Sequence, residues 1–261
     1  MKLLIEKDYI SLSKRAAGIF SALVKEKPDC VLGLATGSTP LGIYQELIRM
    51  GQTEGLDFSR VKTFNLDEYC GLAKSDPQSY HYYMWTNFFS QVNIKLENTF
   101  IPDGQSENAE VECERYDQAL KAQGEVDLQL LGLGENGHIG FNEPGEEFIL
   151  DTHVVKLSQN TIKANSRFFG SVEKVPQYAI TMGIGGIMRA KKILLVVSGK
   201  NKATIVKKLM NDRTISSKVP ASILRLHHDV TVLVDAEIAA VLGGKDNYED
   251  ANQELPYCNT I

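Results

Sequence analysis

The amino-acid sequence predicts an α/β fold, in which an open, mostly parallel Rossmann-like sheet carries helices on both faces. Short β-branched or leucine-rich runs alternate along the chain with segments of helical period, the pattern of a parallel sheet covered by helices. Several of these runs are apolar throughout, as strands buried on both faces are. The length of 261 residues suits one large domain, and 43% hydrophobic with 23% charged residues is typical of a globular chain.

We expect a single domain over residues 1–242 and a C-terminal tail over residues 243–261, where the sequence is polar and loses its periodicity. A segment at about 145–176 interrupts the strand–helix rhythm directly after the most glycine-rich motif. We expect this segment to form a lid insertion over the active site.

The predicted strands follow one another along the whole chain. They are KLLIE (2–6), CVLGLA (30–35), VKTFNL (61–66), NTFIP (98–102), DLQLLGL (127–133), HVVKL (153–157), KILLVV (192–197) and VTVLVD (230–235).

Helical spacing of apolar residues marks the segments between the strands. One stripe consists of Leu12, Ala16, Ile19 and Leu23, and a second of Cys113, Tyr116 and Leu120. The aromatic-rich run SYHYYMWTNFF (79–89) predicts a further helix, which we expect to be largely buried.

Composition excludes several classes of function. The formal charge of −5 gives no general field for nucleic acid or an anionic membrane surface. Four cysteines without CxxC spacing predict reduced thiols, and without HxxxH or HExxH patterns we expect no metal site. We find no signal peptide and no apolar run of about 18 residues, so we expect a cytoplasmic protein.

The run LATGSTPLGIY (34–44) follows the second predicted strand. In open α/β sheets ligands lie outside the carboxyl ends of the strands. The hydroxyls and backbone N–H groups of Thr36, Gly37, Ser38 and Thr39, with Pro40 as the first residue of a helix, predict a phosphate-binding loop. The alternative is a simple Ser/Thr helix cap.

The run FNLDEYCGL (64–72) follows the third predicted strand, so Asp67 and Glu68 lie where the chain leaves the sheet. A carboxylate there can abstract a proton from a carbon next to a carbonyl if its surroundings tune its basicity. In the alternative, Asp67 caps the following turn and Glu68 is solvated.

The run LLGLGENGHIGFNEPGEE (130–147) is the most glycine-rich of the chain and contains Asn136, His138 and Glu143. A histidine on such a loop at a strand end is placed for exposure in a cleft, and a nearby carboxylate can orient its ring. The alternative is a structural loop with an incidental histidine. We interpret His153, His227 and His228 as structural or solvated, because they lack this context.

Two basic residues lie in helical segments: Arg167 in NTIKANSRFFG (160–170), and Lys202 in VVSGKNKATIV (196–206). Spacing alone selects neither, because most lysines and arginines are solvated surface charges.

Together these motifs resemble one family, glucosamine-6-phosphate deaminase. LGLATGSTP, FNLDEY, GLGENGHIGFNEPG, NSRFF and SGKNKA occur in the family's order and nearly its spacing, over residues 1–240. The resemblance implies conversion of D-glucosamine 6-phosphate and water to D-fructose 6-phosphate and ammonia, with no cofactor.

The resemblance also implies a role for each candidate residue. His138 assists opening of the pyranose ring, with Glu143 and Asn136 supporting it, and Asp67 moves the C2 proton to C1. Residues 36–39, Arg167 and Lys202 hold the phosphate, and Arg167 arrives on the lid.

Two departures from the family pattern have consequences. Some members carry Asp where this chain has Asn136, which can orient the His138 ring but cannot offset an imidazolium charge. Relatives that respond to N-acetylglucosamine 6-phosphate carry Arg and Lys where this chain has His153 and Val155. We therefore expect no strong activation by that effector, and the case for a hexamer is weakened; monomer and homo-oligomer both stay open.

Two other functions stay open. The first is a deaminase for galactosamine 6-phosphate, a substrate that differs from glucosamine 6-phosphate only in the configuration of its C4 hydroxyl. A sugar-phosphate sensor without turnover ranks last, because this chain keeps Asp67, His138 and Glu143 and has no helix-turn-helix segment before its first strand.

Overall fold

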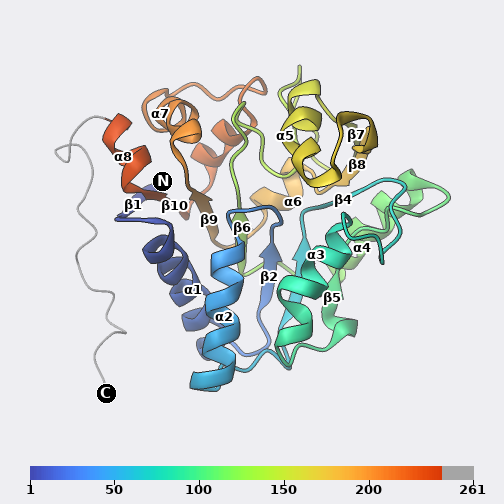
Figure 1. Ribbon diagram of the computed structural model, residues 1–261, viewed down its shortest axis with the longest axis vertical. Helices are drawn as coiled ribbons and strands as arrows, with labels where there is room; N and C mark the ends of the chain where they lie inside the picture. Colours follow the sequence, from blue (N-terminus) through green and yellow to red (C-terminus); the bar gives the residue numbers. More distant parts are fainter. Residues whose placement is uncertain (243–261) are drawn as a thin grey trace.

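The computed structural model describes residues 1–242 and contains the predicted sheet (Figure 1). Seven strands are hydrogen-bonded in the order β1-β10-β9-β6-β2-β3-β5, and every neighbouring pair is parallel. In spatial order they are β1 (Lys2–Glu6), β10 (Val230–Asp235), β9 (Ile193–Val197), β6 (Leu128–Leu131), β2 (Val31–Leu34), β3 (Lys62–Asn65) and β5 (Thr99–Phe100). The predicted open parallel sheet is confirmed.

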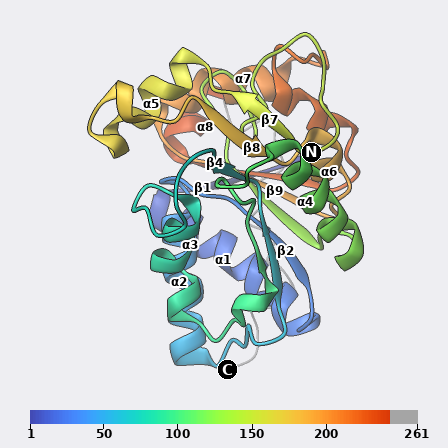
Figure 2. The same cartoon turned by 90° about the vertical axis from the view of Figure 1, so that its right-hand side faces the viewer.

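The central strands are apolar because helices cover both faces of the sheet. Every residue of β2, β6 and β9 is buried. Figure 2 shows α2 and α3 on one side of β2, and α4 on the other. The helices are α1 (Tyr9–Glu26), α2 (Leu41–Glu54), α3 (Tyr80–Asn87), α4 (Ala109–Gln123), α5 (Gln159–Phe169), α6 (Ile184–Met188), α7 (Ala203–Asn211) and α8 (Ala236–Leu242). Short 3-10 turns are η1 (Phe89–Gln91), η2 (Leu96–Asn98), η3 (Val172–Lys174), η4 (Lys200–Lys202) and η5 (Pro220–Leu226).

Helix α1 shows how the local sequence sets an element. Asp8 caps it by accepting a hydrogen bond from Ser11 N, and its buried face includes Leu12, Ala16 and Phe20. The stripe packs against α2 and the strands β1 and β10.

Helix α3 is less buried than its aromatic sequence suggests. Met84 is its one residue in the buried class, whereas Trp85 is 47% exposed and Tyr82 is also exposed. The expectation of a largely buried helix is therefore wrong. The aromatic residues that do pack inward, Phe88 and Phe89, follow the end of α3.

A second, three-stranded sheet lies above the carboxyl edge of the large one in Figure 1. Its antiparallel strands are β4 (Asp67–Tyr69), β8 (Tyr178–Thr181) and β7 (His153–Lys156), in that order. Residues 153–157 were expected to form a strand in the parallel series, but β7 pairs with β8 in the small sheet. The sequence did not predict β4 or β8.

The segment predicted as a lid, residues 145–176, contains β7, α5 and η3 between β6 and β8. A small core of its own joins this segment to the site loops, through Tyr69, Phe141, Leu157, Ile162, Val175 and Ala179. The division into a domain of residues 1–242 with a lid remains a prediction, and the tail at 243–261 lies outside the described residues. Among the described helices, none is both long and apolar enough to cross a membrane.

Candidate active site

Strands β6, β2 and β3 are neighbours in the parallel sheet, so the loops that follow them meet at its carboxyl edge. These three loops carry the residues 134–143, 36–39 and 67–68. The structure therefore brings together the three motifs that the sequence placed after strands.

Two tyrosines hold the backbone of residues 36–39 by its carbonyl oxygens. The Tyr83 hydroxyl donates to Gly37 O at 2.6 Å, and the Tyr9 hydroxyl is 3.1 and 3.0 Å from the oxygens of Ser38 and Thr39. Within residues 1–242, no acceptor engages the N–H groups of Ser38 and Thr39. These groups precede the N-terminus of α2, where an anion is favoured.

Pro40 was predicted as the first residue of the helix, but α2 begins one residue later, at Leu41, and Pro40 is its N-cap. No side chain caps this helix. The alternative of a Ser/Thr cap therefore does not describe this loop. Its free N–H groups fit a phosphate.

Asp67 is the first residue of β4 and is only 6% exposed. Burial, and secondly the charge of Glu68, raise the pKa of Asp67 from 3.8 to about 8. Within the described chain, no side chain or N–H group donates a hydrogen bond to its carboxylate. A buried carboxylate without donors is a strong base when it is ionised.

The glycine-rich loop comes close to Asp67 at Gly140. A Cβ on Gly140 would lie 3.1 Å from Thr181 Oγ1 and 3.4 Å from Asp67 Oδ2, and its φ of +57° is left-handed. Glycine at this position therefore lets the His138 loop lie directly against Asp67.

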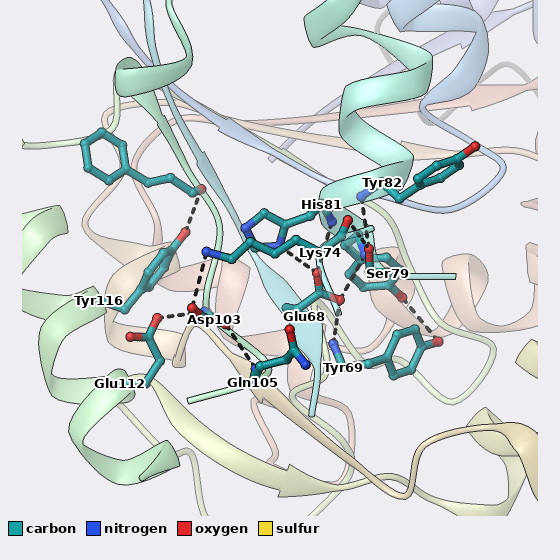
Figure 3. A network of polar contacts seen from close by, with 12 residues as sticks. Glu68, Tyr69, Lys74, Ser79, His81, Tyr82, Asp103, Gln105, Glu112 and Tyr116 are labelled. Carbon is teal, nitrogen blue, oxygen red and sulfur yellow. Dashed lines mark hydrogen bonds and ion pairs between the residues drawn. The ribbon is translucent and has the colours of Figure 1, made fainter. Parts of the chain in front are cut away.

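Neither part of the alternative that the sequence left open is observed: Glu68 is buried, not solvated, and it is Glu68, not Asp67, that accepts from N–H groups at the start of α3, whose N-cap is Ser79. Glu68 is 1% exposed, and its Oε1 accepts from Tyr69 N (2.8 Å) and Tyr80 N (2.9 Å). Its Oε2 accepts from His81 N at 3.0 Å and lies 2.9 Å from His81 Nδ1 (Figure 3). The carboxylate thus ties β4 to the N-terminus of α3.

His138, Asn136 and Glu143 come together on the loop after β6. His138 Nδ1 lies 3.7 Å from Glu143 Oε2, the distance of an ion pair when the ring is protonated. The ring packs over Gly134, where a Cβ would lie 2.3 Å from two ring atoms. The local fold therefore requires glycine at 134 to seat the histidine.

Asn136 contacts Glu143 and the backbone, not the His138 ring as the sequence led us to expect. Its Nδ2 donates to Glu143 Oε2 at 2.8 Å, and its Oδ1 accepts from His138 N at 3.2 Å. Asn136 therefore positions the histidine through the loop and through Glu143.

Glu143 also contacts the start of α5. Its Oε1 accepts hydrogen bonds from Thr161 Oγ1 and from Ser158 Oγ, the latter at 3.2 Å, at the start of α5. Burial raises the pKa of Glu143, but His138, Thr161 and Asn136 together outweigh it and lower the pKa from 4.5 to about 2. Glu143 is thus a fixed negative charge beside His138.

A cavity of about 640 Å³, the His138 cavity, lies between the glycine-rich loop and the lid. Its lining residues are Glu135, Asn136, His138, Asn160, Thr161, Lys163 and Lys202. Glu135 Oε1 accepts from Asn201 Nδ2 at 2.6 Å, which holds η4 and Lys202 against the loop.

Burial lowers the pKa of Lys202. The charge of Glu135 raises this pKa, and the charge of Arg167 lowers it further. Arg167 and Lys202 therefore act on one region of the site. Arg167 is exposed on α5, with its guanidinium 4.7 Å from the centre of the Phe168 ring. It does not line the His138 cavity.

A second cavity of about 140 Å³, the Tyr69 cavity, adjoins the loop that follows β2. Gly37 and Ser38 line it together with Tyr69, Asn165 and Phe169. Helix α5 contributes residues to both cavities, so it lies between the anion-binding loop and the histidine.

Sequence reasoning missed several residues of this arrangement. Asn165 Nδ2 donates to the Tyr69 hydroxyl at 2.9 Å, and Ser158 and Thr161 hold Glu143. The signals were present: Tyr69 and Asn165 belong to FNLDEY and NSRFF, and Ser158 stands where a helix N-cap is expected. Among the described residues, no group of three or more His, Cys, Asp or Glu side chains is placed to hold a metal ion.

Comparisons with known proteins agree with this geometry. A family model described as glucosamine-6-phosphate isomerases/6-phosphogluconolactonase matches residues 9–233. The chain is 54% identical over 246 residues to a glucosamine-6-phosphate deaminase of Thermoanaerobacter sp. (strain X514), covering 94% of this chain and 97% of the relative. It is 51% identical over 242 residues to a glucosamine-6-phosphate deaminase of Clostridium perfringens (strain 13 / Type A), covering 93% and 100%.

A solved structure described as a monomeric glucosamine-6-phosphate deaminase superposes with a TM-score of 0.90 at 52% identity, covering 92% of this chain and all of that one. Fold, site and sequence identity thus lead to one assignment: the chain belongs to the family of glucosamine-6-phosphate isomerases and 6-phosphogluconolactonases, and within it to the glucosamine-6-phosphate deaminases.

Proposed function

We propose that this protein converts D-glucosamine 6-phosphate and water to D-fructose 6-phosphate and ammonia. The observation that carries the proposal is the buried, donor-free carboxylate of Asp67 against the loop of His138. A reaction that moves one proton between adjacent carbons needs such a base, and the relatives named above carry the same activity in their names.

Ring opening is the step assigned to His138. Its imidazole takes the proton of the C1 hydroxyl and returns one to the ring oxygen, which releases the open-chain aldehyde. Glu143 stabilises the imidazolium across 3.7 Å, and Asn136 holds Glu143 in place.

Proton transfer is the step assigned to Asp67. Its carboxylate removes the C2 proton, which the C1 carbonyl acidifies, and the enediol-type intermediate carries the amine on C2. Asp67 returns the proton to C1; the C1 oxygen gains a proton and the C2 nitrogen loses one, so C1 becomes a hydroxymethyl group and C2 an imine. Water adds to the imine and ammonia leaves, which gives the ketose; no oxidant or reductant is consumed, so no cofactor is required.

The phosphate is assigned to three groups. The N–H and hydroxyl groups of residues 36–39 receive it at the start of α2, and the ammonium of Lys202 and the guanidinium of Arg167 supply positive charge. Arg167 lies on α5, so its contact with the phosphate depends on the position of the lid.

Ammonia release tests the proposal. Wild type and Asp67→Asn are compared with glucosamine 6-phosphate and galactosamine 6-phosphate, and substrate binding is measured in parallel by calorimetry. We expect ammonia from the gluco substrate, and its loss in Asp67→Asn with binding retained. Turnover of the galacto epimer alone keeps the mechanism and reassigns the substrate. Binding of both sugars without ammonia contradicts the proposal and favours a sensor.

A further inference from the structure

The strand that carries Asp67 has a second buried carboxylate, for which the proposed reaction has no use. Glu68 accepts two hydrogen bonds on each oxygen, three from backbone N–H groups and one with the His81 ring (Figure 3). Both carboxylate oxygens act only as acceptors when the group is ionised, so these four contacts fit an ionised Glu68. Its negative charge therefore lies one residue from the base.

His81 is the titratable group that touches this carboxylate. Its ring lines a cavity of about 420 Å³, the His81 cavity, on the outer side of β4, and its side chain is 21% exposed. The ring can therefore exchange a proton with solvent while Nδ1 stays 2.9 Å from Glu68.

The other charges around the His81 cavity are paired with one another. Lys74 Nζ lies 3.2 Å from Asp103 Oδ2, and Arg115 Nε lies 2.6 Å from Glu112 Oε2. Histidine is the side chain that ordinarily changes charge near neutral pH, so among these described groups His81 is the one suited to alter the net charge there.

We propose that Glu68 and His81 form a positioning pair that acts through Asp67: Glu68 fixes β4 on α3, and His81 sets the net charge next to the base. The inference rests on the proposed function. When His81 is neutral, the charge of Glu68 makes Asp67 hold its proton more tightly. When His81 is protonated, it offsets that charge, and a larger fraction of Asp67 stays ionised in mild acid.

Two substitutions separate this effect from simple damage, because they act with opposite sign. The quantity measured is the ratio of kcat/KM at pH 6 to kcat/KM at pH 8.5, from ammonia release. His81→Asn keeps a donor near Nδ1 but loses the charge, so we expect this ratio to fall about threefold with little change at pH 8.5. Glu68→Gln removes the negative charge, so we expect the ratio to rise about tenfold, as one pKa unit of Asp67 requires.

The double variant and a matched control complete the experiment. Since the Glu68 carboxylate is the contact that favours the protonated His81 ring, adding His81→Asn to Glu68→Gln is expected to change the ratio less than His81→Asn changes it in wild type. The pair Lys74→Gln with Asp103→Asn removes both charges of one ion pair in the same cavity without touching Glu68, so the net charge there is kept and the ratio is expected to stay unchanged.

The outcomes are distinguishable. Wild type that releases no ammonia contradicts the proposed function. If wild type releases ammonia and His81→Asn lowers kcat/KM equally at both pH values, His81 has a merely structural role, and this inference alone is overturned. If Glu68→Gln fails to fold by circular dichroism, 13C NMR of the Asp67 carboxyl decides: His81→Asn must lower its ionised fraction at pH 6, and an unchanged fraction contradicts the inference.

Discussion

Asp67 and Glu68 are adjacent buried carboxylates that differ in the hydrogen bonds they accept. Asp67 is buried without a donor, and Glu68 is buried with four. Desolvation acts on both, but only Glu68 is compensated by hydrogen bonds to its charged form. The assignment of Asp67 as the base therefore follows from the missing donors, not from burial.

Replacing Asp67 by Asn is expected to lower kcat by about 10²–10⁴-fold and to stabilise the fold. The pKa of Asp67 is about 8 in the folded protein against 3.8 for the free side chain. Its contribution to stability is fully present below pH 3.8 and is lost as the pH rises through 8. Since Asn does not ionise, the gain in Tm over wild type should grow between pH 5 and pH 8.5. A gain independent of pH would show that Asp67 is not held in its acid form.

Glu143 has the opposite dependence on pH. Its folded pKa of about 2 lies below the ordinary 4.5, so its stabilisation is present above pH 4.5 and is lost as the pH falls towards 2. Glu143→Gln should therefore lower the urea midpoint at pH 7, and the difference from wild type should shrink as the pH falls from 4.5 towards 2. Its kcat should fall at least about tenfold, because His138 loses its counter-charge. Unchanged turnover would remove Glu143 from the mechanism.

The residue types of the site could be predicted from sequence, but their partners could not. Asp67, His138 and Glu143 stand in motifs after strands, which fixes their place at the carboxyl edge. The sequence does not show the burial of Glu68, because three of its four contacts come from residues 80–81, and only the folded chain brings the start of α3 to β4. Asn136 was paired with the wrong group for a similar reason, since Glu143 competes for its amide.

At the scale of elements, α5 connects the two cavities. Its first turn holds Glu143 through Thr161 and Ser158, and its later residue Asn165 holds Tyr69. A displacement of α5 therefore changes the support of the histidine and the wall of the Tyr69 cavity together.

Thr161→Val tests this connection with a nearly isosteric side chain. The loss of the hydroxyl that donates to Glu143 is expected to lower kcat/KM by about tenfold, since hydrogen bonds to charged groups contribute about 1.5–3 kcal/mol. Thr53→Val is a matched control, because Thr53 lies on α2 and its hydroxyl contacts only Arg49 of the same helix. Equal activity of the two variants would contradict a role for the lid helix in holding Glu143.

The elements of the parallel sheet could be predicted, whereas those of the small sheet could not. Strands buried on both faces are apolar runs that stand out in any sequence. β4 has three residues, two of them acidic, and β8 forms only because β4 and β7 flank it. Such strands depend on long-range pairing, which short sequence windows do not contain. The burial of α3 was wrongly predicted for a related reason. Residue type alone does not show which face of a helix is covered by other elements.

In the whole molecule, the carboxyl edge of the sheet carries the site, whereas the amino edge carries contacts that hold strands together. The site lies at the carboxyl edge, and Asp127 lies at the amino edge, just before β6. It is 5% exposed and bonds Lys27 Nζ, Lys191 Nζ and Val31 N at 2.8–2.9 Å. This junction joins the approaches to three adjacent strands, β2, β6 and β9.

Asp127→Asn should therefore reduce stability without reducing turnover. We expect a loss of about 1–3 kcal/mol in the free energy of unfolding at pH 7, measured with urea, and an unchanged kcat. Burial raises the pKa of Asp127, but its hydrogen bonds to the two lysines and to the strand N–H outweigh this and leave the pKa below its ordinary 3.8. The loss should thus shrink as the pH falls through 3.8. A fall in kcat at full folding would show that the amino edge reaches the site.

The order of the strands also determines when the sheet can be completed during synthesis. β2, β3, β5 and β6 all lie within residues 31–131 and pair with one another, so this half can assemble while the rest of the chain is still being made. β1, by contrast, pairs only with β10, with Lys2 opposite Thr231. β1 must therefore wait for β10, and so large a sequence separation makes its docking a late and slow event. Until then the apolar side of α1 lacks its contact with β10.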